Sequence, residues 1–170
     1  MAAGDVHPIP DEALANTSYL VDVGGGEAVV IDPHRDIDEY LALAEQHGLR
    51  IVASLETHLH ADFVSGSREL AKTARADVIA PAGADLRFTH RPVSEGDTVA
   101  LGEATFEVLH TPGHTPEHVA YLMTRPTRAV FTGGSLIAGG AARTDLTGQE
   151  LNRGAGSGPV SIPASDRWSR

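Results

Sequence analysis

The segment Glu56-Thr57-His58-Leu59-His60-Ala61-Asp62 decides how this sequence is interpreted. It directly follows a short apolar run at 49–55, which predicts a buried strand. Side chains two positions apart in extended chain point to the same side, so His58 and His60 are expected to face one point, with Asp62 continuing the line. Two imidazoles and a carboxylate at the end of a buried strand predict a metal site. The alternative is a polar turn in which Asp62 caps the next helix.

A second segment rich in histidine is Leu109-His110-Thr111-Pro112-Gly113-His114-Thr115-Pro116-Glu117-His118. The Pro112-Gly113 pair favours a tight turn that would present His114 at a strand edge. An exposed loop that happens to carry histidines is the alternative. Together with His58 and His60, His114 would complete a set of three imidazoles with an open fourth position, which is typical of catalytic zinc.

The remaining pattern predicts a mixed α/β arrangement in a single domain. Gly24-Gly25-Gly26 indicates a hairpin turn, and Asp36 is expected to cap a helix that Gly48 closes. The expected strands lie at 17–23, 27–32, 49–55, 77–80, 97–101, 104–110, 118–124 and 128–132, with a second helix at about 62–75. We expect the domain to cover residues 1–146 and residues 147–170 to form a loose tail.

Composition narrows the class of function. The 170 residues include 23 acidic and 13 basic ones, a formal net charge of −10, which argues against nucleic acid or an anionic membrane as a partner. The sequence has no cysteine, so thiolate metal sites and cysteine nucleophiles are excluded. It has no apolar run long enough for a membrane helix and no secretory signal pattern, and we therefore expect a cytoplasmic protein.

The order and spacing of three motifs resemble the metallo-β-lactamase superfamily. They are Thr57-His58-Leu59-His60-Ala61-Asp62, Thr111-Pro112-Gly113-His114-Thr115 and Val130-Phe131-Thr132-Gly133-Gly134. Glu56 through Gly66 and Arg143-Thr144-Asp145-Leu146 are similar to motifs of persulfide dioxygenases and their rhodanese-linked relatives. Glyoxalase II (hydroxyacylglutathione hydrolase) is the next relative. The resemblance implies an αββα sandwich with a metal at one edge of the two sheets.

The resemblance also implies roles for individual residues. His58, His60 and His114 match a three-histidine metal site, and Asp62 matches an aspartate that binds a second metal in dinuclear members and is our candidate catalytic residue. In persulfide dioxygenases, one iron is held by residues that match His58 and His114 together with an aspartate. Arg143 would pair with a substrate carboxylate such as that of glutathione.

The sequence departs from the family pattern in three places. Phe63 stands where dinuclear members usually have a histidine, which favours a single metal ion. The aspartate of the third motif falls at Gly134, so the usual triad of two histidines and one carboxylate is incomplete. The later family segment that completes the sandwich has no evident counterpart, and we expect a C-terminally shortened domain.

Three functions follow as hypotheses. The first is a persulfide dioxygenase-like enzyme that oxidises glutathione persulfide to sulfite with O₂ at one Fe²⁺. The second is a Zn²⁺-dependent thioester hydrolase of the glyoxalase II type. The third is a non-catalytic remnant that lacks the aspartate at Gly134. In each enzyme hypothesis the partner is a small thiol-derived substrate, and a homodimer is an alternative to a monomer.

Overall fold

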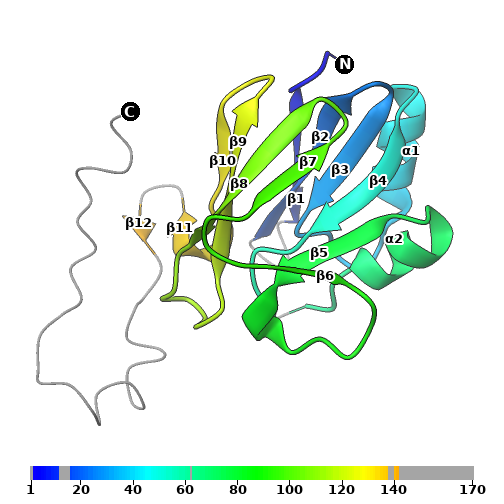
Figure 1. Cartoon of the computed structure of the whole chain (residues 1–170). Helices are drawn as coiled ribbons and strands as arrows, with labels where there is room; N and C mark the ends of the chain where they lie inside the picture. The colour runs from blue at the N-terminus through cyan, green and yellow to red at the C-terminus, as the bar shows by residue number, and fades with distance from the viewer. Residues whose placement is uncertain (1, 12–15, 62, 138–139, 142–170) are drawn as a thin grey trace, which may run out of the picture.

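The computed structural model describes residues 2–11, 16–61, 63–137 and 140–141, which form two β-sheets packed face to face (Figure 1). The larger sheet has six strands in the order β1-β2-β3-β4-β5-β6. Its first two pairs are antiparallel, and β3 to β6 run parallel. The strands are Val6–Asp11, Asn16–Gly24, Glu27–Ile31, Arg50–Leu55, Asp77–Pro81 and Arg91–Val93.

The smaller sheet has four antiparallel strands in the order β10-β9-β8-β7. These are Thr98–Leu101 (β7), Ala104–His110 (β8), Val119–Arg125 (β9) and Ala129–Phe131 (β10). A short pair follows, made of β11 (Leu136–Ile137) and β12 (Gly140–Ala141).

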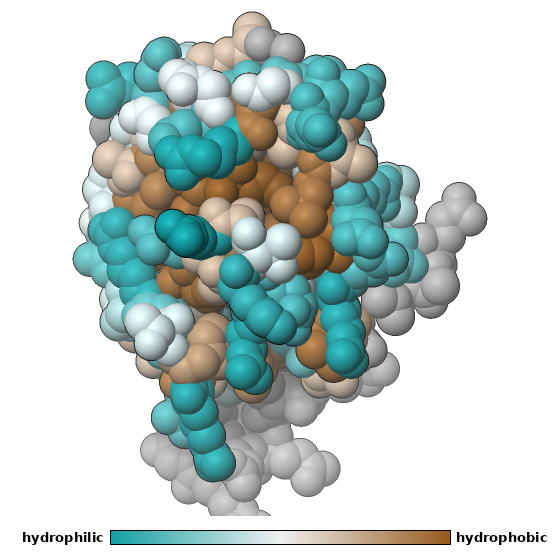
Figure 2. Space-filling view, turned by 90° about the vertical axis from the view of Figure 1, so that its right-hand side faces the viewer, coloured by the Kyte–Doolittle hydropathy of each residue, from teal (hydrophilic) through white to brown (hydrophobic). Residues whose placement is uncertain are grey.

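Two α-helices, α1 (Asp38–Gln46) and α2 (Ser67–Thr73), lie on the side of the larger sheet that faces away from the smaller one (Figure 1). Short 3₁₀ turns occur at Ala82–Ala84 and Gly133–Ser135. Neither α-helix has the length and apolar character of a membrane span. On this side of the molecule, hydrophobic residues gather in the middle and hydrophilic ones surround them (Figure 2).

The strands of the larger sheet alternate their side chains between two apolar clusters, whereas those of the smaller sheet contribute only to the first. The first cluster lies between the sheets and includes Phe106, Tyr121 and Phe131. The second lies between the larger sheet and the helices, and Tyr40 and Leu70 are its largest fully buried side chains from the helices. Burying each such side chain contributes about 1.5–3 kcal/mol, so the sandwich is stabilised on both faces of the larger sheet.

The structure agrees with most expected strands and corrects three local predictions. The helix expected at 62–75 is shorter and begins only at Ser67. The N-cap of α1 is Ile37 rather than Asp36, although Asp36 accepts a hydrogen bond from the Asp38 N–H at 3.2 Å. Strand β1 was not expected, because its two prolines interrupt the strand pattern. Proline is tolerated there because β1 is an edge strand.

The two packed sheets agree with the sandwich that the motifs led us to expect (Figure 1). Within the residues that the structure describes, helices cover only one of the two sheets. The predicted tail at 147–170 lies outside the described residues.

Candidate metal centre

The segment after β4 places its two histidines as the alternation predicted. His58 is 6% exposed and Leu59, which points the other way, is 52% exposed. The side chain of His60 is only 4% exposed. Glu56 and Thr57 precede them and are also buried. The segment leaves the carboxyl end of a parallel strand, which is where α/β sheets place ligand sites.

Asp32 anchors this segment from the neighbouring strand end. It follows β3 and has a φ of +48°, a left-handed conformation that is uncommon for a residue other than glycine. Its Oδ1 accepts the Thr57 N–H and its Oδ2 accepts the Thr57 hydroxyl, both at 2.7 Å. Burial would raise the pKa of Asp32, but hydrogen bonds from His60 and Thr57 and the charge of His60 lower it. Asp32 is therefore ionised and accepts hydrogen bonds only.

Thr57, held by Asp32, in turn contacts the ring of His58. The Thr57 Oγ1 lies 2.9 Å from His58 Nδ1. Because the single hydroxyl proton is donated to Asp32, Thr57 can only accept from His58, so the proton of the neutral ring resides on Nδ1. Burial, followed by the charge of His60, lowers the pKa of His58 to about 3. His58 is thus neutral at pH 7, and its Nε2 lone pair is free for a metal.

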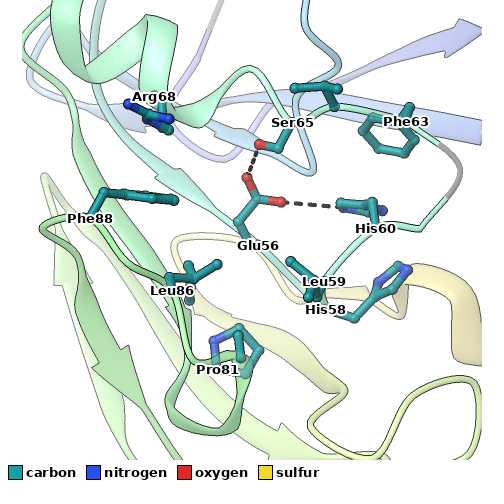
Figure 3. Close-up of a pocket in the computed structure, with 13 residues that line it drawn as sticks. Glu56, His58, Leu59, His60, Phe63, Ser65, Arg68, Pro81, Leu86 and Phe88 are labelled. Atoms are coloured by element: carbon teal, nitrogen blue, oxygen red, sulfur yellow. Dashed lines mark hydrogen bonds and ion pairs between the residues drawn. The ribbon is translucent and has the colours of Figure 1, made fainter.

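His60 lies between two carboxylates. Its Nε2 is 3.3 Å from Asp32 Oδ1. It is also 3.2 Å from Glu56 Oε2, the contact drawn in Figure 3. Burial alone would lower the pKa of His60, but the hydrogen bonds and charges of Asp32 and Glu56 raise it to about 10. The other oxygen of Glu56 accepts the hydroxyls of Ser65 and Ser67, which ties the segment to the start of α2. A metal ion at His60 would replace a proton that these carboxylates hold in place.

The second histidine-rich segment joins β8 to β9 and reaches the same place. The ring of His114 lies 4.8 Å from that of His58 between centroids. His118 is fully buried, and its ring stacks on His58 at 4.9 Å. Burial lowers the pKa of His118 to about 4, and its Nδ1 lies 2.8 Å from Thr111 Oγ1. The sequence placed His118 only beside the site, and no local pattern indicated that its ring is buried against His58.

These contacts define an imidazole cluster of His58, His60, His114 and His118. Among the described residues, Asp32, His58 and His60 form the group whose ligand atoms all lie within 4.8 Å of one another. Two imidazoles and one carboxylate suit iron, and three imidazoles suit zinc. The neutral, pre-oriented His58 beside an ionised Asp32 fits a divalent ion, because such ligands must be deprotonated before they bind one. Ligation by His58, His60 and His114 remains a prediction.

Gly133 and Gly134 pack directly against the cluster. A Cβ on Gly134 would lie 2.7 Å from Cδ2 and 3.1 Å from Nε2 of His114. A Cβ on Gly133, which has a φ of +49°, would lie 2.2 Å from Thr57 Oγ1. The place where the family pattern has an aspartate is therefore occupied by the His114 ring.

Phe63 lies against the cluster as well. Its ring is 4.1 Å from that of His60 and contains no ligand atom. Two further predicted site residues, Asp62 and Arg143, lie outside the described residues.

Comparison with known proteins agrees with this fold and site. Residues 11–170 match the family model of the metallo-beta-lactamase superfamily, and the chain belongs to that superfamily. It is 36% identical over 148 residues to the hydroxyacylglutathione hydrolase of Rhodospirillum rubrum, an alignment that covers 84% of this chain and 56% of that protein. This chain thus spans about half the length of the curated relatives it matches.

Solved structures give the same result. ETHE1 from Myxococcus xanthus superposes with a TM-score of 0.76 at 31% identity and covers 83% of this chain and 62% of its own. TTHA1623 in a di-iron-bound form superposes with a TM-score of 0.68 at 34% identity, over 84% of this chain and 78% of its own. Both close relatives that the motifs indicated, persulfide dioxygenase and glyoxalase II, are supported.

Proposed function

We propose that this protein is a mononuclear metalloenzyme of the persulfide dioxygenase type. In the overall reaction, RSSH + O₂ + H₂O gives RSH and sulfurous acid, which ionises to sulfite. A bound Fe²⁺ would supply the redox chemistry with O₂. The observation that carries the proposal is the donor set of Asp32, His58 and His60, two imidazoles and one carboxylate within 4.8 Å. In this donor set Asp32 would supply the carboxylate ligand, although the sequence has Gly134 where the family pattern has an aspartate.

The surrounding residues support one metal ion rather than two. Phe63 covers one face of His60 with a ring that cannot ligate. The relative TTHA1623 is seen in a di-iron-bound form, which supports iron as a metal for this fold, although that protein holds two ions. Relatives named hydroxyacylglutathione hydrolase support a small thiol-derived substrate.

The chain's own residues have distinct roles in this proposal. Asp32 and Thr57 hold the tautomer of His58, while Glu56 and Asp32 hold the ring of His60. His114 closes the cluster from the other sheet. Asp62 as a catalytic residue, Arg143 as a substrate ligand, a homodimer and a cytoplasmic location remain predictions from the sequence.

A Zn²⁺-dependent thioester hydrolase is the second candidate. It is favoured by the 36% identity to a hydroxyacylglutathione hydrolase and by the three imidazoles, which could lower the pKa of a zinc-bound water to about 7. The two candidates differ in metal, co-substrate and product, so one set of assays separates them.

The experiment is metal analysis of protein purified without chelators, followed by oxygen uptake with Fe²⁺ and glutathione persulfide. We expect about one ion per chain and sulfite production that His58→Ala abolishes. His110→Ala is the matched control, because His110 is exposed in the same motif as His114. Turnover of glutathione thioesters with Zn²⁺ and no oxygen uptake would favour the hydrolase. Less than about 0.1 ion per chain and neither activity would instead favour a non-catalytic remnant.

A further inference from the structure

A cavity of about 280 Å³ opens beside His58 and His60. Its walls come from the segment after β4 and from the segment that follows β5, and they are mainly apolar (Figure 3). Leu59, Phe63 and Val64 line one side, and Pro81, Leu86 and Phe88 line the other. Leu59 and Val64 are 52% and 63% exposed and are two of the large hydrophobic side chains that the described surface leaves open to water. Exposed apolar groups that converge on a cavity are typical of a ligand site.

Arg68, in the first turn of α2, lies at the wall of this cavity. Its guanidinium carbon is 5.4 Å from the centre of the Phe88 ring (Figure 3). None of the ion pairs found among the described residues involves Arg68. Glu56 also lines the cavity. Its Oε1 accepts the hydroxyls of Ser65 and Ser67, whereas its Oε2 lies 3.2 Å from His60 Nε2 and has no hydrogen-bond partner among the described residues. Arg68 is thus a cation beside an apolar cavity, and none of the hydrogen bonds or ion pairs found within the described part of the chain engages its guanidinium.

We propose that this cavity binds the body of a small, largely apolar monocarboxylate, with the carboxylate on Arg68. The inference rests on the proposed function, because it places the sulfur of such a thiol-derived substrate toward His58 and His60. A volume of about 280 Å³ lies near the lower end of the range for small-molecule sites, so the proposed ligand is small.

The apolar walls and Arg68 are expected to contribute unequally to the binding free energy. Contact with the apolar walls supplies most of it, since exposed charge pairs contribute little. Arg68 is exposed, so its loss is expected to weaken binding by only about threefold to fivefold. The charge therefore selects among ligands of similar shape more than it strengthens all of them.

The test uses phenylacetate and its neutral analogue phenylacetamide as probes, titrated by calorimetry into the full-length protein. We expect Arg68→Gln to weaken the binding of phenylacetate by about threefold to fivefold and to leave the binding of phenylacetamide unchanged. Arg87→Gln is the matched control, because Arg87 is exposed and does not line the cavity. Val64→Glu adds a negative charge at an exposed position of the cavity wall. We expect it to weaken the binding of phenylacetate more than the binding of phenylacetamide.

Equal binding of phenylacetate to the wild type and to both cavity variants would overturn the proposal. These titrations need neither metal nor O₂. If oxygen uptake fails while the probes bind as expected, the proposed function is wrong and the cavity assignment stands. If oxygen uptake succeeds and the probes do not bind, only the cavity assignment is wrong.

Discussion

At the scale of single residues, two carboxylates and one hydroxyl organise the imidazole cluster. Asp32 holds Thr57, and Thr57 holds the Nδ1 proton of His58. Glu56 and Asp32 share His60. Hydrogen bonds of this kind set the tautomer and orientation of metal-binding histidines. The residues around the histidines therefore determine whether the cluster can bind an ion.

The first prediction concerns Thr57. Thr57→Val keeps the shape of the side chain and removes the hydroxyl that joins Asp32 to His58, leaving buried polar atoms without a partner. We expect a loss of about 1–3 kcal/mol in the free energy of unfolding and about 10–100-fold weaker metal binding. Urea unfolding and metal competition measure the two effects. Thr57→Ser retains the hydroxyl, and an equal loss of metal affinity in this variant would contradict the role of the hydroxyl.

The second prediction concerns Gly134. Gly134→Asp would add a carboxylate where the family pattern has one, and the His114 ring must shift because the new Cβ would lie 2.7 Å from it. We expect tighter Fe²⁺ binding than in the wild type, because a carboxylate is a better ligand for this ion than an amide. Gly134→Asn requires the same shift and supplies only a neutral oxygen, so equal metal binding in both variants would argue against ligation at this position.

At the scale of elements, side-chain hydrogen bonds tie both helices to the larger sheet and its loops. Ser65 and Ser67 donate to the buried Glu56, and this draws the chain before Ser67 away from a helical path. That is why α2 starts later than its apolar spacing predicted. Helix α1 is held by Tyr40, whose hydroxyl lies 2.7 Å from Ser18 Oγ and accepts the His34 N–H at 3.0 Å.

The third prediction concerns Tyr40. Burial raises its pKa to about 12. The folded-state pKa lies above the unfolded value of about 10, so its stabilising effect is complete below pH 10 and is lost as the pH rises toward 12. Tyr40→Phe is expected to cost about 1–3 kcal/mol at pH 7 and to reduce the fall in stability between pH 10 and 12. Urea unfolding across this range measures both effects, and an unchanged alkaline slope in the variant would contradict the assignment.

At the scale of the whole molecule, the candidate metal centre joins the two sheets. His58 and His60 follow β4 of the larger sheet, whereas His114 and His118 lie between β8 and β9 of the smaller one. The cluster therefore exists only when the sandwich is closed. An ion bound there would stabilise the folded chain by mass action, because the unfolded chain does not hold these groups together.

The fourth prediction follows from this coupling. At a free Zn²⁺ concentration 100 times the dissociation constant, the free energy of unfolding is expected to rise by about 2.7 kcal/mol. Thermal unfolding with Zn²⁺, and again after addition of a chelator, measures the effect. His58→Ala should remove the increase, and His110→Ala should retain it. A wild-type midpoint that does not respond to the ion would contradict a folded-state metal site.

Much of the fold was predictable because local patterns carry it. Strand alternation and the Gly24-Gly25-Gly26 turn depend on neighbouring residues, and both appear as expected. The inward direction of His58 and His60 follows from the same alternation. His118 and Arg68 were not identified as site residues, because burial and neighbours across space have no signature in local spacing.

By itself, the sequence determined the superfamily, the sandwich fold and the segments that carry the histidines, since these depend on short-range spacing and strand periodicity. Only the tertiary structure decided which carboxylates meet which imidazoles. Asp32 and Thr57 are 25 positions apart, and their contact depends on the pairing of β3 with β4. The pKa values of the two histidines shift in opposite directions: burial lowers the pKa of His58, whereas the neighbouring carboxylates raise the pKa of His60.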